Sequence, residues 1–98
     1  MDFLKELGIE QNNYGACVGG KEWIKTGKGK KLDSVNPSTG EIIASVYQAT
    51  DTDYEKVMKV SEDAFNQWKK VPAPVRGQLV REIADALREK KDALGSLV

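Results

Sequence analysis

The sequence predicts an α+β fold in which short antiparallel strands precede two long helices. Alternating and β-branched residues gather between residues 16 and 48, whereas residues 50–98 carry apolar side chains at helical spacing. Pro72 and Pro74 separate the two helical segments. We therefore divide the chain into an N-terminal turn and loop (1–15), a β meander (16–48) and a two-helix segment (50–98).

The N-terminal segment begins with a short amphipathic turn. Phe3, Leu4 and Leu7 share one side of it, and Gly8 ends it. Residues 11–15 are polar apart from Tyr14 and are expected to form a loop.

The meander is expected to begin with an extended segment, residues 16–25. Gly19 and Gly20 interrupt this segment and indicate a bulge or bend. A short strand at residues 32–35 and a turn at residues 36–40 follow, since Pro37 and Gly40 suit the turn.

The best strand covers residues 41–48. Ile42, Ala44 and Val46 share one face, and Ile43, Ser45 and Tyr47 share the other. Because both faces carry apolar residues, we expect the strand to be covered on both sides.

The first long helix has two possible caps, Thr50 and Thr52, and Thr52 with Glu55 fits a capping box. A single apolar stripe follows, formed by Tyr54, Val57, Met58, Ser61, Ala64, Phe65 and Trp68.

The second long helix is expected to run from about Pro74 to the last residue. Gly77 suggests close packing on another backbone. Arg81 with Asp85 and Arg88 with Asp92 have the spacing of ion pairs on the solvated face of this helix.

The apolar stripe of the second long helix continues to the final residues, so we expect the chain to be the front part of a larger protein. The stripe consists of Leu79, Val80, Ile83, Leu87, Leu94, Leu97 and Val98.

The composition excludes several classes of function. Fifteen Lys and Arg balance fifteen Asp and Glu, so net charge does not favour nucleic acid or an anionic membrane as a partner. The chain has no His and one Cys, so it offers no imidazole base, no thiolate metal cluster and no intrachain disulfide. It has no secretory signal and no apolar run that could span a bilayer. A cytoplasmic location is the expectation.

Two glycine motifs resemble phosphate-binding loops but lack their context. Residues 15–21 match G-x-x-x-x-G-K, yet Glu22 follows where Ser or Thr should hold Mg²⁺, and no helix is expected next. Gly27 and Gly29 lack a third glycine and a flanking helix. We interpret both motifs as bends or turns.

The remaining candidates also have structural explanations. Cys17 has no activating base, so we interpret it as a strand residue rather than a nucleophile. The lysines of residues 25–31 are interpreted as a solvated turn, with weak anion or nucleic-acid binding as the alternative. Tyr54, Phe65 and Trp68 could line a ligand groove, but their helical spacing favours a core. We predict no catalytic, cofactor-binding or metal-binding side chain in this chain.

Residues 35–43, VNPSTGEII, resemble the N-terminal signature of aldehyde dehydrogenases. The segments that follow keep the family's order, and three of them resemble its antiquitin branch: PAPVRG (72–77), ALREK (86–90) and LGSLV (94–98). The resemblance covers residues 4–98 but only about the first fifth of such an enzyme. Residues 26–33 form a charged loop that varies among relatives, and this loop says nothing about the substrate.

The resemblance implies that the chain is part of the α/β NAD-binding domain of a larger, homo-oligomeric (tetrameric) enzyme. That branch oxidises α-aminoadipic semialdehyde, which equilibrates with Δ1-piperideine-6-carboxylate, in lysine breakdown. A thiolate attacks the aldehyde, hydride passes to NAD, and the thioester is hydrolysed. The family's nucleophile, base and cofactor motifs lie downstream, so the chain alone is expected to be inactive.

The resemblance leaves two roles for these residues. Carbonyls just before the NP turn help some relatives to hold a monovalent cation, which implies Ser34 or Val35 as a carbonyl donor here. The helices are implied to bury Phe65, Trp68, Leu79, Ile83 and Leu87 against the rest of the NAD-binding domain. The alternative is a stand-alone protein-interaction module that docks a partner on its apolar stripe.

Overall fold

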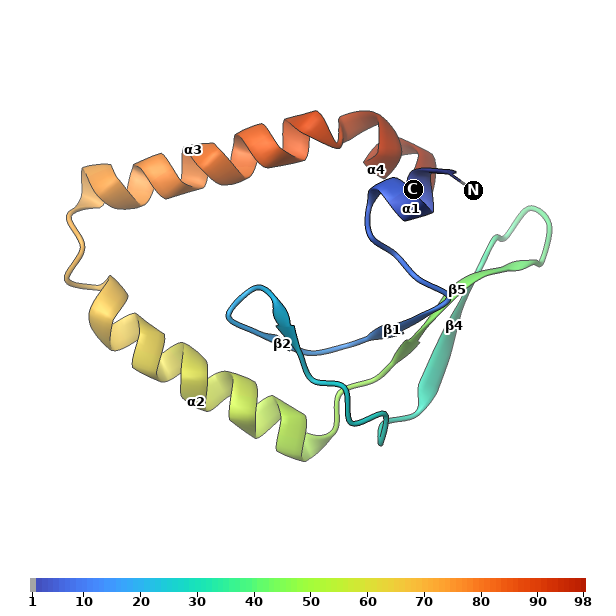
Figure 1. The fold of residues 1–98 in the computed structure, drawn as a ribbon, viewed down its shortest axis with the longest axis horizontal. Coiled ribbons are helices and arrows are strands. Elements are labelled where there is room, and N and C mark those ends of the chain that lie inside the picture. The colour runs from blue at the N-terminus through green and yellow to red at the C-terminus, as the bar shows by residue number, and fades with distance from the viewer. Residues whose placement is uncertain (1) are drawn as a thin grey trace. The chain divides into compact units, whose positions relative to one another are not determined.

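The computed structural model describes residues 2–98, which separate into two compact units, one of residues up to Gly8 with Ala64–Val98 and one of Ile9–Asp63. Short strands precede the long helices, so the α+β prediction is confirmed (Figure 1). The elements are α1 (Asp2–Glu6), β1 (Asn12–Tyr14), β2 (Cys17–Val18), β3 (Glu22–Trp23), β4 (Lys31–Val35), β5 (Ile42–Tyr47), α2 (Asp51–Trp68), α3 (Ala73–Glu89) and α4 (Lys91–Leu97).

The β4–β5 hairpin has the turn that the sequence predicts. The backbone N–H of Asn36 donates to the Glu41 carbonyl at 2.9 Å, and that of Gly40 donates to the Asn36 carbonyl at 2.7 Å. Gly40 has a φ of 78°, a backbone conformation that favours glycine. The predicted strand at 41–48 is confirmed as β5, and adjacent residues Ala44 and Ser45 are both buried, as expected for a strand covered on both faces.

Residues 11–15, predicted as a loop, instead contain β1, which pairs in parallel with β5. The three-stranded sheet therefore has the order β1-β5-β4 and is mixed rather than antiparallel. The Asn13 side chain fixes this strand, because its amide nitrogen donates to the carbonyls of Glu10 (2.7 Å) and Ser45 (3.0 Å). Asparagine is disfavoured in strands, so this pairing depends on contacts distant in the sequence, which local pattern does not reveal.

Two glycines allow the strands to approach the end of β5. A Cβ on Gly15 would lie 2.7 Å from the Tyr47 carbonyl oxygen, and one on Gly29 would overlap the Gln48 carbonyl. Backbone hydrogen bonds hold the chain at this place: the Gly15 N–H donates to the Tyr47 carbonyl and the Gln48 N–H to the Lys30 carbonyl, both at 2.9 Å. Glycine is therefore required on both sides of residues 47–48.

The strands β2 and β3 form a separate antiparallel hairpin rather than the start of a continuous meander. Gly19 and Gly20, with φ of 67° and 79°, close this hairpin in place of the expected bulge or bend. The meander prediction over residues 16–48 is therefore correct for two hairpins and wrong about their continuity.

The cap of α2 is Thr50, not Thr52. The Thr50 hydroxyl oxygen accepts from the Asp53 N–H at 3.2 Å, and the Asp53 carboxylate accepts from the Thr50 N–H at 3.0 Å. This reciprocal pair replaces the predicted box of Thr52 with Glu55, and Asp53 is only 7% exposed.

The second helical segment is broken at Lys90 instead of running to the end of the chain. Lys90, with φ of −102° and ψ of 11°, ends α3 and precedes α4. Arg88 lies in the last turn of α3 and Asp92 in the first turn of α4, and the helix dipole favours each of these two charges. The two predicted ion pairs are replaced by one between Arg88 and Asp85, at 2.9 Å.

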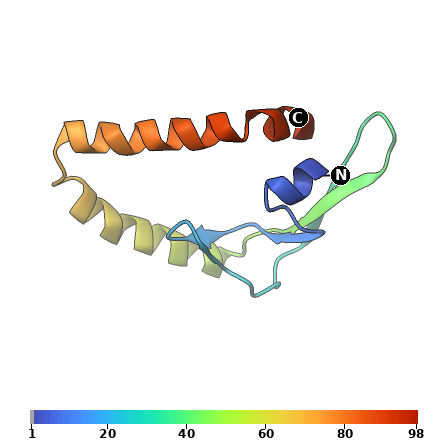
Figure 2. The same ribbon diagram turned by 45° about the horizontal axis from the view of Figure 1, so that its top comes forward.

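A small apolar contact joins the chain's two terminal helices. Figures 1 and 2 show α1 beside α4, and the two helices contact each other. Phe3, Leu4 and Leu7 are partly buried, and Ala93 on α4 is 4% exposed. The predicted amphipathic turn is confirmed, and the Gly8 φ of 73° marks its end.

Candidate functional site

The candidate residues of the sequence analysis can be placed within the described residues 2–98. Within this range no three His, Cys, Asp or Glu side chains lie together as metal ligands would. Cys17 lies on β2 opposite Trp23, and its thiol faces only the Val18 carbonyl, at 4.0 Å. The chain has no His to activate this thiol.

The glycine motif at residues 15–21 does not form a phosphate cradle. A phosphate-binding loop leads from a strand into a helix, whereas Gly19 and Gly20 here close a hairpin and β3 follows. The motif is therefore a hairpin turn between two strands, not the bend within a single strand that the sequence predicts.

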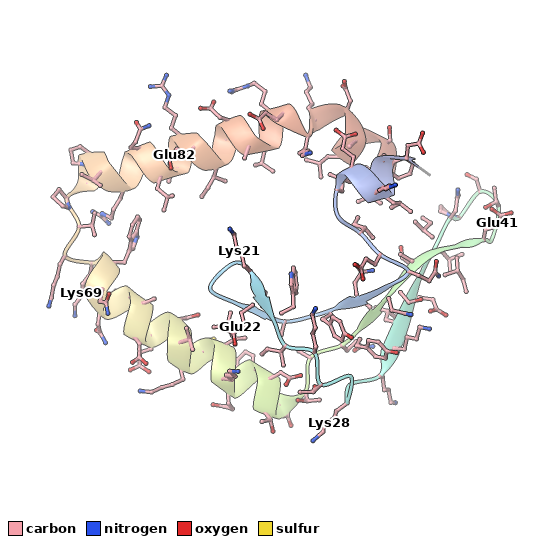
Figure 3. All side chains as sticks on the ribbon, viewed as in Figure 1. Lys21, Glu22, Lys28, Glu41, Lys69 and Glu82 are labelled. Atoms are coloured by element: carbon pink, nitrogen blue, oxygen red, sulfur yellow. The ribbon has the colours of Figure 1, made fainter. Side chains whose placement is uncertain are left out.

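The lysines of residues 25–31, interpreted from the sequence as a solvated turn, lie at the surface. Lys25, Lys28, Lys30 and Lys31 are all exposed. Lys21 on the β2–β3 hairpin and Lys28 in the next loop point in opposite directions (Figure 3). This arrangement agrees with a solvated turn, in which exposed lysines bind anions weakly.

The apolar stripe on α2 is one candidate interaction face. Tyr54, Phe65 and Trp68 have the predicted helical spacing, yet they are 58%, 54% and 40% exposed. The amino group of Lys69 lies 5.5 Å from the centre of the Phe65 ring, within reach of a cation–π contact. These residues therefore do not form a core within the described chain.

The apolar stripe of α3 is a second candidate interaction face. Leu79, Ile83 and Leu87 recur every four residues and are 42%, 52% and 56% exposed. Charged residues such as Glu82 lie elsewhere on the helix (Figure 3). Among the described residues, the apolar side chains that are buried are Ala44 (8% exposed) and Ala93 (4% exposed), both too small to anchor a long helix. The expected close packing on Gly77 is also not supplied by this chain, since no atom of the described residues approaches its Cβ position within 4 Å.

Ser34 and Val35, the residues implied as cation carbonyl donors, lie at the end of β4. The register shifts between them, because Ser34 pairs with Ala44 and Val35 with Ile42, which leaves Ile43 as the extra residue. Such irregularities redirect backbone carbonyls. The cation role of these carbonyls stays a prediction.

Several polar contacts are missing from the sequence-based predictions. The Ser45 hydroxyl donates to the Asp33 carboxylate at 2.5 Å across the β4–β5 pair, and Ser45 is 4% exposed. The Nε of Arg76 is shielded from solvent and has no hydrogen-bond partner among the described residues. Of the polar contacts in this structure, the reciprocal pair of Thr50 and Asp53 could have been found in the sequence, because its spacing is that of a capping box. The positions of Ser45 and Arg76 depend on which strands or helices lie next to each other.

Comparison with known proteins identifies the family. The model of the aldehyde dehydrogenase family matches residues 23–98. The chain is 48% identical over 98 residues to aldehyde dehydrogenase family 7 member A1 of Pisum sativum, covering 100% of this chain and 19% of that protein. It is 45% identical over 96 residues to alpha-aminoadipic semialdehyde dehydrogenase of Bos taurus, covering 98% of this chain and 17% of that protein.

A more distant relative, a putative aldehyde dehydrogenase family 7 member A1 homolog of Caenorhabditis elegans, is 41% identical over 96 residues, covering 98% of this chain and 17% of that protein. The chain thus spans about a fifth of the length of the curated relatives it matches. No helix in residues 2–98 is long and apolar enough to cross a membrane. The family match and the agreement along the whole chain show that this protein belongs to the aldehyde dehydrogenase family, a family of oxidoreductases.

Proposed function

We propose that this chain is the N-terminal structural segment of an NAD-dependent aldehyde dehydrogenase that oxidises α-aminoadipic semialdehyde to the carboxylic acid. The observation that carries the proposal is the similarity of the whole chain to enzymes named for this substrate, such as the bovine relative at 45% identity. Rat and mouse proteins of the same name are 42% and 41% identical to this chain.

In this proposal the role of the segment is to support the enzyme rather than to carry out the reaction. Bound NAD supplies the hydride acceptor, and the groups that hold it lie outside residues 1–98. The stripe of α3 and that of α2 cover the rest of the NAD-binding domain. The exposure of Phe65, Ile83 and Leu87 supports this role, since large apolar side chains at helical spacing usually meet a partner surface.

The proposal extends to the setting of the enzyme. We place it in the cytoplasm, in lysine degradation, as a homo-oligomer of tetrameric form. The segment packs against the remainder of the aldehyde dehydrogenase polypeptide. The similarity of this chain to a part of much longer relatives supports this partner. The isolated segment is expected to have no dehydrogenase activity.

A second function is favoured by the same exposed stripe. A stand-alone module could use Leu79, Ile83 and Leu87 to dock an amphipathic partner. This function requires that the 98-residue chain be a natural product that folds cooperatively by itself.

The mass of the natural polypeptide separates the two functions. We would detect the protein in extracts of the source cell with an antibody against residues 54–92. The extracts are denatured first, because in the proposed enzyme these helices are buried and the antibody could not reach them. A product several times heavier than 10.8 kDa supports the enzyme. A product of 10.8 kDa overturns it and favours the module.

The activity of the heavier product tests the substrate. The natural polypeptide, purified under native conditions, should form NADH with α-aminoadipic semialdehyde far more efficiently than with acetaldehyde at equal concentration. Equal kcat/KM values for the two aldehydes would contradict the proposed substrate while leaving the family assignment intact.

A further inference from the structure

We draw no further inference here: the strongest candidate, the apolar stripe of α3 formed by Leu79, Ile83 and Leu87, belongs to the interaction face already described, and nothing in the structure shows what else covers it.

Discussion

At the scale of single residues, the fold depends on a few positions where an added Cβ atom would clash or a lost side-chain oxygen would leave a backbone N–H unpaired. Gly15 and Gly29 flank the backbone of residues 47–48 so closely that neither has room for a Cβ. Thr50 and Asp53 satisfy each other's backbone N–H groups at the start of α2. A larger residue could not replace either glycine without a clash. An apolar residue could not replace Thr50 or Asp53 without the loss of a capping hydrogen bond.

Replacing Gly29 should destabilise the protein. In Gly29→Ala the new methyl group overlaps the Gln48 carbonyl, so the start of β4 must move and the Gln48 to Lys30 hydrogen bond weakens. We expect a loss of about 1–3 kcal/mol in the free energy of unfolding, measured by urea denaturation of the natural polypeptide.

The matched control is Gly77→Ala, whose Cβ meets no atom of the described chain. Because alanine is favoured inside a helix, this variant should gain up to about 1 kcal/mol. A loss at Gly77 would show instead that the remaining polypeptide packs against it, and no loss at Gly29 would contradict the close approach.

The cap of α2 can be tested by comparing two threonines. Thr50→Ala removes the acceptor for the Asp53 N–H and should cost about 1 kcal/mol of stability. Thr52→Ala, within the same first turn, removes no cap and should stay within about 0.5 kcal/mol of the parent. Thermal unfolding of the two variants measures the difference in stability. A larger loss of stability in Thr52→Ala would show that Thr52 caps the helix instead of Thr50.

At the scale of elements, the amphipathic helices are defined by the sequence more completely than the sheet. The stripes of α2 and α3 follow from helical spacing alone, and the turn of residues 36–40 follows from its own Pro and Gly. By contrast, β1 was not predictable, because three residues with two asparagines become a strand only when β5 lies beside them.

The break at Lys90 was not predictable from the apolar pattern, because the apolar stripe continues past residue 90 to Leu94 and Leu97. The charges beside Lys90 give no clear signal either. Arg88 and Asp92 suit the two helix dipoles, whereas Glu89 at the end of α3 and Lys91 at the start of α4 do not.

The apolar stripe of α3 gives a prediction about the proposed enzyme. Ile83 is 52% exposed in this chain, but the proposal buries it against the rest of the polypeptide. Ile83→Ala should therefore cost the whole enzyme about 2–5 kcal/mol in the free energy of unfolding.

Its control is the neighbouring variant Glu82→Ala, which should change the stability of the enzyme by less than about 0.5 kcal/mol. Denaturant unfolding of the parent enzyme and both variants gives the comparison. Two equally small effects would mean that the α3 stripe stays exposed in the enzyme.

At the scale of the whole molecule, the described residues bury little of their apolar surface. Most large apolar side chains of β4, α2 and α3 are exposed, as Leu32 (55%), Val60 (37%) and Val80 (63%) illustrate. Family membership was predictable from residues 35–43 and 72–98, because sequence motifs persist without their packing partners. The core predicted for the stripes of α2 and α3 is not formed, since their large side chains stay exposed among the described residues.

The isolated 98-residue chain should therefore associate with itself and form no NADH. Size-exclusion chromatography with light scattering should give a mass above 10.8 kDa that rises with concentration. The double variant Leu79→Lys with Leu87→Lys should reduce this association, because it places charge on the α3 stripe. A cooperatively unfolding monomer would instead favour the stand-alone module.

The parallel pairing of β1 with β5 also sets an order of assembly. Pairing β4 with β5 closes a loop of about six residues (36–41). Pairing β1 with β5 closes a loop of about 27 residues (15–41). By chain statistics, closing the longer loop costs roughly 1.3 kcal/mol more in conformational entropy. The hairpin should therefore be the early folding unit, with β1 arriving late. In a pulse-labelling experiment the amides of β4 and β5 should gain protection from hydrogen exchange before those of β1.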